Sequence, residues 1–197
     1  MPLREELLGV GERIVTHFAT GGEPPFILYQ YLPTEEWKVR RDLGELRRWL
    51  EATPRGINCA AISLADLFWQ ALDESGYLEE LIALEREATE VSDSSALREV
   101  YAAVGEILRE PPTLPDRVIA EVADYDDRTA VFLYRAGALY PAYRTSTLLD
   151  DLRGRLVHPV TLLYPGRLSG EYGLRFMGRN EPAYGYRALI VPRETSV

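Results

Sequence analysis

The residues best suited to chemistry lie in one segment, Arg135–Leu152, which reads RAGALYPAYRTSTLLDDL. The apolar run Ala130–Tyr134 precedes it and predicts a buried strand. In a parallel α/β sheet, ligands tend to bind outside the carboxyl ends of the strands. Gly137 permits a sharp or positive-φ turn at that place. The segment is therefore expected to lie where such a fold binds its ligand.

Two arginines of this segment suit anion binding. Arg135 and Arg144, with backbone N–H groups near residues 145–147, could hold a carboxylate or a phosphate. A second turn at residues 164–166 ends the apolar run Val160–Tyr164, and it opens on the same edge if the two strands are neighbours. The candidate binding residues are Arg135, Gly137, Tyr140, Pro141, Tyr143, Arg144, Tyr164, Pro165 and Gly166.

The sequence contains none of the familiar catalytic motifs. It has no G-x-x-x-x-G-K-[ST] phosphate loop and no G-x-S-x-G nucleophile turn. One cysteine and two histidines cannot furnish a closed zinc site, so we expect no metal ion and no cofactor. Tyrosine and arginine are also enriched at protein–protein hot spots. The segment is therefore predicted to be a binding surface rather than an active site.

Charge is unevenly distributed along the chain. The net charge of −9 argues against a surface that binds nucleic acid throughout. Residues 128–197 hold ten arginines and five acidic residues, a charge of +5, so residues 1–127 carry −14. The basic part indicates either an anionic partner or ligand, or neutralisation of the acidic part within the fold. With one cysteine and no long apolar run, we expect a cytoplasmic protein that does not enter a membrane.

Hydrophobic periodicity predicts helices separated by short apolar strands. Cys59 lies in the apolar run Ile57–Leu64, which predicts a strand buried on both faces and a buried structural thiol. Thr34 is expected to cap a helix whose apolar stripe is Trp37, Leu43, Leu46 and Leu50. The other helices are predicted at 3–18, 65–74, 77–88, 96–109 and 116–122, and the other strands at 26–31, 130–134, 160–164, 172–177 and 187–191.

Strands that alternate with helices imply crossover connections. The predicted class is α/β: a mostly parallel sheet with helices on both faces and a helical insertion around 65–123, in a single domain 1–197.

The string GALYPAYRTSTLLDDL, followed by PVTLLYPG and later YRAL, resembles the BrxB family, the small component of bacteriophage-exclusion (BREX) defence systems. The stretches PFILYQY and GINCAAISL also resemble the first two strands of that family. The resemblance implies a cytoplasmic accessory protein without an assigned catalytic activity. Its expected partners are the other BREX components, and above all a PglZ-like, phosphatase-related protein. The family supplies no agreed catalytic residues to transfer.

Three hypotheses remain open from the sequence. The first is a non-catalytic assembly subunit of a BREX-type complex that binds the PglZ-like protein. The second is a degenerate nucleotide- or anion-binding domain that lacks a P-loop and uses the turn from Gly137 to Arg144. The third is a nucleic-acid accessory that uses the basic C-terminal part, and the overall acidity argues against direct nucleic-acid binding of this kind.

Overall fold

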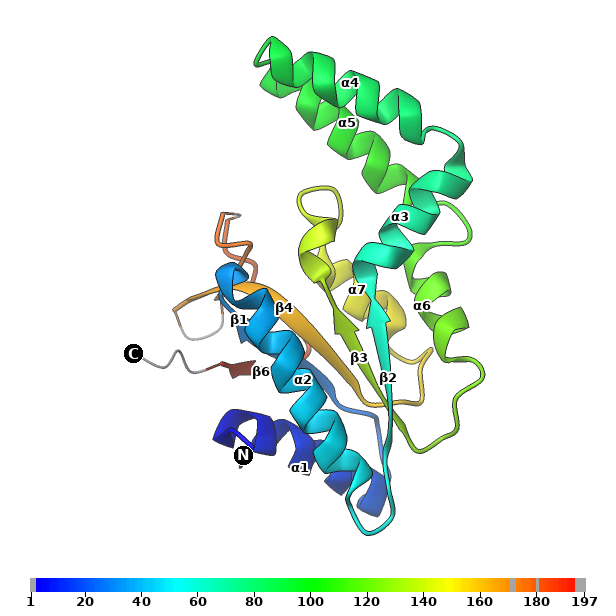
Figure 1. Cartoon of the computed structure of the whole chain (residues 1–197), viewed down its shortest axis with the longest axis vertical. Coiled ribbons are helices and arrows are strands. Elements are labelled where there is room, and N and C mark those ends of the chain that lie inside the picture. The colour runs from blue at the N-terminus through cyan, green and yellow to red at the C-terminus, as the bar shows by residue number, and fades with distance from the viewer. Residues whose placement is uncertain (1–2, 171–172, 180, 194–197) are drawn as a thin grey trace.

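The computed structural model describes residues 3–170, 173–179 and 181–193 (Figure 1). The helices are α1 (Glu5–Thr20), α2 (Glu36–Glu51), α3 (Leu64–Ser75), α4 (Leu78–Glu90), α5 (Ser94–Ile107), α6 (Leu114–Val122) and α7 (Thr145–Leu152), with short 3-10 helices η1 (Pro33–Glu35) and η2 (Ala136–Leu139). The strands are β1 (Phe26–Tyr31), β2 (Asn58–Ser63), β3 (Thr129–Tyr134), β4 (Val160–Ser169), β5 (Gly173–Phe176) and β6 (Leu189–Pro192).

The sheet is mostly parallel. Five strands run parallel in the order β2-β3-β4-β1-β6, and β5 pairs antiparallel with residues 166–169 of β4. Helical crossovers between successive strands keep the strands parallel. The predicted α/β class is confirmed, and β3 and β4 are neighbours, so the turns that follow them share one edge.

Helices cover both faces of the sheet (Figure 1). Alternate strand residues point to opposite faces, so Ile27 and Tyr29 meet α1 and α2, whereas Leu28 faces the other side. On that second face α3, α6 and α7 pack over Leu28 and Leu133. The three central strands β1, β3 and β4 are thus buried between two helical layers, and this arrangement fixes the carboxyl edge of the sheet.

The helical insertion predicted at about 65–123 consists of α3 to α6. Gly76, in the left-handed region with φ 76°, separates α3 from α4. The Asp93 side chain caps α5 by accepting hydrogen bonds from the backbone N–H groups of Ser95 and Ala96. Both breaks fall where the sequence predicts them. The helices α4 and α5 form a hairpin that projects beyond the carboxyl ends of β2 and β3 (Figure 1).

Strand β2 differs from its prediction. It lies at the end of the strand order, so Asn58 and Ala61 are exposed and the expected burial on both faces is wrong. Cys59 is only partly buried, yet burial raises its pKa to about 12 and keeps the thiol protonated at neutral pH. Tyr172, the predicted start of the fifth strand, lies outside the described residues.

Helix α2 also differs from its prediction. Trp37, expected on the apolar stripe, is 63% exposed, and Val39 takes the buried position instead. Trp37 stands six residues before Leu43, a spacing that turns it away from the face shared by Leu46 and Leu50. Thr34 lies inside η1 and does not cap α2, whose N-terminus has no side-chain cap.

Helix α6 begins at a capping box, and the aspartate of this box also pairs with Arg155, in the turn after α7. The Thr113 side chain accepts from the backbone N–H of Asp116, and the Asp116 carboxylate accepts from the Thr113 backbone N–H. Arg155 Nη2 lies 2.6 Å from Asp116 Oδ1. Arg155 and the Thr113 donors lower the pKa of Asp116 to about 2.

We expect Asp116→Asn to lower the free energy of unfolding at pH 7 by about 1 kcal/mol, because the cap and the ion pair both weaken. The carboxylate of Asp116 stabilises the fold above its unfolded pKa, and this contribution is lost as pH falls from about 4 to about 2. The difference between the two proteins should therefore close over that interval. Urea unfolding between pH 7 and pH 2.5 measures it, with Asp73→Asn as the control. A pH-independent difference would contradict the assignment.

Candidate functional site

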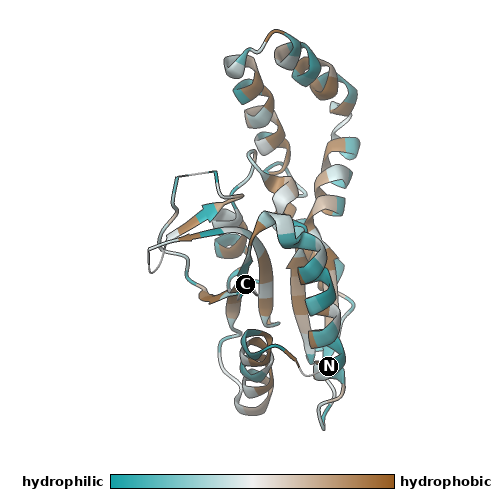
Figure 2. Cartoon of the chain, turned by 60° about the vertical axis from the view of Figure 1, so that its left-hand side comes forward, coloured by the Kyte–Doolittle hydropathy of each residue, from teal (hydrophilic) through white to brown (hydrophobic). Residues whose placement is uncertain are grey.

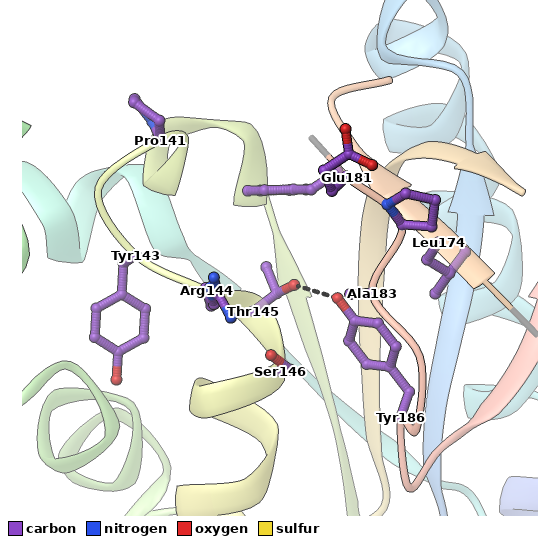
Figure 3. Close-up of a pocket in the computed structure, with 11 residues that line it drawn as sticks. Pro141, Tyr143, Arg144, Thr145, Ser146, Leu174, Glu181, Ala183 and Tyr186 are labelled. Atoms are coloured by element: carbon purple, nitrogen blue, oxygen red, sulfur yellow. Dashed lines mark hydrogen bonds between the residues drawn. The ribbon is translucent and has the colours of Figure 1, made fainter. Parts of the chain in front are cut away.

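The candidate binding segment borders a pocket of about 410 Å³ at the carboxyl edge of the sheet. One wall is the start of α7 and the residues before it, and the opposite wall comes from β5 and the segment that follows β5 (Figure 3). The lining residues are Pro141, Tyr143, Arg144, Thr145, Ser146, Leu174, Phe176, Glu181, Pro182, Ala183 and Tyr186. We call this cavity the edge pocket.

Arg144 is the cation of the edge pocket. It is exposed, it occupies the N-cap position of α7, and it forms no ion pair with any described residue. Arg144 provides no side-chain cap, so the first backbone N–H groups of α7 receive no side-chain acceptor from the N-cap residue. Both features favour an anion. Glu181 lines the same pocket and opposes an anion, so the site has mixed charge.

Hydroxyl groups line the base of the pocket. Thr145 Oγ1 and Tyr186 Oη lie 3.4 Å apart, the contact drawn as a dashed line in Figure 3. The ring of Tyr186 packs edge-on against Tyr164, whose hydroxyl is buried and has no hydrogen-bond partner among the described residues. Burial, with Tyr186 nearby, raises the pKa of Tyr164 well above its usual value. The hydroxyls of Thr145 and Tyr186, which line the pocket, can donate hydrogen bonds to a polar ligand or accept them from it.

Arg135 and Gly137 lie outside the pocket lining. Arg135 Nη1 is 2.7 Å from Asp66 Oδ1 on α3, so this arginine joins β3 to the helical insertion. The left-handed residue after β3 is Arg135, with φ 58°, whereas Gly137 lies in the tight 3-10 turn η2, so the sharp turn is found and the positive-φ alternative is not. Gly137 packs close to Met177, since a Cβ atom there would lie 3.2 Å from Met177 Sδ and this side chain would have to shift slightly.

Tyr140, Pro141 and Tyr143 occupy the loop between η2 and α7. The ring of Tyr140 packs edge-on against Phe176, with centroids 6.0 Å apart, and Pro141 stands at the rim of the edge pocket. Tyr143 is buried under the Arg109 guanidinium, 5.4 Å from its ring, and burial raises its pKa to about 12. Its ring points away from Tyr186 in Figure 3. Pro141 and Arg144 are thus the candidates most open to a ligand.

The turn expected at residues 164–166 is wrong: β4 continues to Ser169 because β5 pairs with its second half, and Tyr164, Pro165 and Gly166 are buried within the strand. Tyr164 has no exposed surface, Pro165 accepts a hydrogen bond from the backbone N–H of Met177, and Gly166 accepts one from the Gln30 side chain. These three residues join β4 to β1 and β5 and support the base of the pocket. Any effect they have on binding passes through the residues they position.

Comparison with known proteins supplies the family. A protein-family model described as BREX protein BrxB matches residues 60–191 of the 197-residue chain. The chain belongs to the BrxB family. Membership of the BrxB family implies a component of a BREX defence system, and so a role in antiviral defence. No curated protein and no solved structure matches the chain in the corresponding searches.

The BrxB match contains the whole edge pocket and the projecting hairpin, and it begins within β2. The stretch Phe26–Tyr31, which resembles the first strand of the family, lies outside the match, and its assignment stays a prediction. In this BrxB protein, the described residues contain no group of three or more His, Cys, Asp or Glu side chains arranged to hold a metal ion. Among the same residues, no helix has the length and apolarity needed to cross a membrane.

Sequence reasoning missed the second wall of the edge pocket in this BrxB protein. Glu181 and Tyr186 lie in an irregular segment between β5 and β6, where periodicity gives no signal. Leu174 and Phe176 come from β5, which folds back on β4. The clustering of tyrosines after residue 124 was the available clue, but it does not indicate which of them meet.

Proposed function

We propose that this BrxB-family protein is a non-catalytic assembly subunit of a BREX-type phage-defence complex and that it binds the PglZ-like protein of its own system. The observation that carries the proposal is the family match over residues 60–191. The exposed side chains of the molecule support it. Large apolar residues such as Trp69, Tyr77 and Val91 are at least half exposed, and exposed aromatic side chains commonly anchor protein–protein interfaces.

Co-purification tests the assembly role. The tagged chain and the PglZ-like protein of the same system, expressed together, are expected to elute as one complex at low and at physiological salt. A second tagged chain of similar size and acidity serves as the control for non-specific capture. Separate elution at both salt concentrations would count against the proposal.

A second candidate function is the binding of a nucleotide or another anion in the edge pocket. The free guanidinium of Arg144 beside the uncapped start of α7 favours it, and the hydroxyls of Thr145 and Tyr186 add hydrogen-bonding groups. Glu181 would have to lie away from the bound charge. This role is compatible with the assembly role, because one protein can hold an anion and a partner at different places.

Thermal shift with millimolar ATP, GTP or a dinucleotide tests the edge pocket. A ligand that binds only the folded state raises Tm, by an amount equivalent to about 2.7 kcal/mol when its concentration is a hundred times Kd. We expect Arg144→Gln to reduce the shift, since the cation is lost. Glu181→Gln should increase it, because a repelling carboxylate is removed. The same shift in all three proteins would place the ligand elsewhere, and no shift in any of them would leave this function without support.

A further inference from the structure

The projecting hairpin of α4 and α5 exposes apolar side chains that a hairpin of its size would ordinarily bury. Along α4 only Leu81 and Ala88 are buried, whereas Ile82 and Leu84 are 44% and 46% exposed. Val91, at the tip, is 69% exposed. Figure 2 shows apolar and hydrophilic residues interleaved along both helices. The hairpin therefore offers apolar surface away from the sheet.

Leu81 and Ile82 line an apolar hollow of about 240 Å³ at the base of the hairpin, which we call the arm groove. Phe68 and Trp69 of α3 form one side, and the ring of Trp69 is half exposed. Ile82 of α4 and Tyr101 of α5 form the other side. Its floor is the loop of residues 138–142, which contains two residues of the candidate binding segment, Tyr140 and Pro141.

Pro141 lines both the arm groove and the edge pocket. The loop between η2 and α7 thus separates an apolar hollow from a polar one. The base of α5 packs tightly on this loop, because a Cβ atom at Gly105 would lie 2.6 Å from the Ala142 carbonyl oxygen. The residues that line the arm groove all lie within the part of the chain that the family model matches, residues 60–191.

Acidic residues surround these hollows. Residues 78–107 contain eight acidic residues and two arginines, a net charge of −6 out of −9 for the chain. Among the described residues, Glu106 alone of these eight forms an ion pair, with Arg109. Glu85 lines the arm groove, and Glu87, Asp93 and Glu99 line a second hollow of about 370 Å³ between α4 and α5. Asp93 caps α5, whereas the glutamates that line the two hollows remain available to an incoming cation.

Charge decides between the possible occupants. The carboxylates repel nucleic acid and anionic lipid, and two copies of the hairpin would repel one another. A helix with an apolar stripe and flanking Lys or Arg residues matches both the apolar groove and the carboxylates around it, since apolar residues spaced three and four apart fill a groove between helices. We infer that the arm groove binds a basic amphipathic helix of a partner protein. This inference rests on the proposed assembly role and identifies the surface that performs it.

The test uses the full-length chain and the PglZ-like protein of the same system, with Kd measured by biolayer interferometry. Trp69→Ala is expected to weaken binding about tenfold or more, because a half-exposed tryptophan in a groove is a typical hot spot. Trp37→Ala is the matched control, since Trp37 is exposed on α2 at the opposite face of the sheet, and its Kd should not change. Circular dichroism melts establish that both variants fold.

Charge reversal gives a second, independent readout. Glu85→Lys combined with Glu99→Lys should weaken binding about tenfold or more and flatten its dependence on salt, whereas Glu12→Lys on α1 should do neither. If the wild-type chain binds and both Trp69→Ala and the double charge-reversal variant bind equally well, the inference about the arm groove is wrong and the assembly role stands. If the wild-type chain does not bind, both fail. Self-association of the chain that Trp69→Ala abolishes would identify a second copy as the occupant and overturn the inference.

Discussion

Replacing Arg193 with methionine should lower the free energy of unfolding by about 3–5 kcal/mol, because it leaves the buried carboxylate of Asp42 without its cation and removes one of the two cations that pair with Glu35. The Arg193 side chain is 3% exposed, with Nε 2.7 Å from Asp42 Oδ2 and Nη1 3.2 Å from Glu35 Oε2. Both acids are also buried. For a chain of this length such a loss lowers Tm by about 10 °C or more, which calorimetry measures directly.

The pH dependence separates the charge effect from lost packing. Burial raises the pKa of Glu35, but Lys38 and Arg193 outweigh it, and the pKa is lowered overall. Without Arg193, one of the two cations that lower the pKa of Glu35 is lost, so the pKa of Glu35 rises and its protonation removes part of the penalty as pH falls. The difference in stability between Arg193→Met and wild type should therefore be largest near pH 7 and shrink toward pH 4.

Arg47→Met is the matched control. Arg47 pairs with Glu51 one helical turn away, and both side chains are substantially exposed. An exposed pair of this kind contributes about 0.5 kcal/mol or less. A loss at Arg193 no larger than that at Arg47, or one independent of pH, would show that the buried network stabilises the fold far less than its geometry implies.

This network also shows where sequence reasoning stops. The apolar runs are sufficient to predict the strands, because burial on a sheet requires a run of that kind. Asp42 occupies a core position of α2 only because Arg193, 151 residues later, reaches it. Local periodicity cannot reveal a partner so distant in the sequence. The predicted apolar stripe of α2 was therefore Trp37, Leu43, Leu46 and Leu50, and Asp42 was not included among the buried positions.

The candidate site was predictable in the same partial way. The rule that ligands lie beyond the carboxyl ends of parallel strands led to the loop between η2 and α7, and Arg144 and Pro141 do line a pocket there. The opposite wall depends on how an irregular segment returns to the sheet, which no local pattern encodes. Tyr164 and Gly166 were grouped with the binding residues because the strand was expected to end at Tyr164, but β4 continues to Ser169 and the β5 hairpin covers them.

Among the residues that join β4 to β1 and β5, Gly166 should show the largest effect on stability when it is replaced. A Cβ atom at residue 166 would lie 2.5 Å from the Arg175 carbonyl oxygen and 2.5 Å from Cε1 of Tyr164. Neither neighbour can move cheaply, since one is backbone paired in the β4–β5 hairpin and the other is a ring with no exposed surface. We expect Gly166→Ala to lower the free energy of unfolding by about 2–3 kcal/mol and Tm by about 5–10 °C.

Gly44→Ala provides the control, because Gly44 lies in α2 with no atom within 4 Å of an added Cβ. That change should leave stability unaltered or increase it by up to about 1 kcal/mol, the helix preference of alanine over glycine. The substitution should displace β5, which contributes Leu174 and Phe176 to the edge pocket. Gly166→Ala should therefore also weaken the binding of a ligand in the edge pocket, although residue 166 does not line it. Equal melting temperatures for Gly166→Ala and wild type would mean that the hairpin adjusts freely, and Gly166 would then return to the residues considered for direct binding.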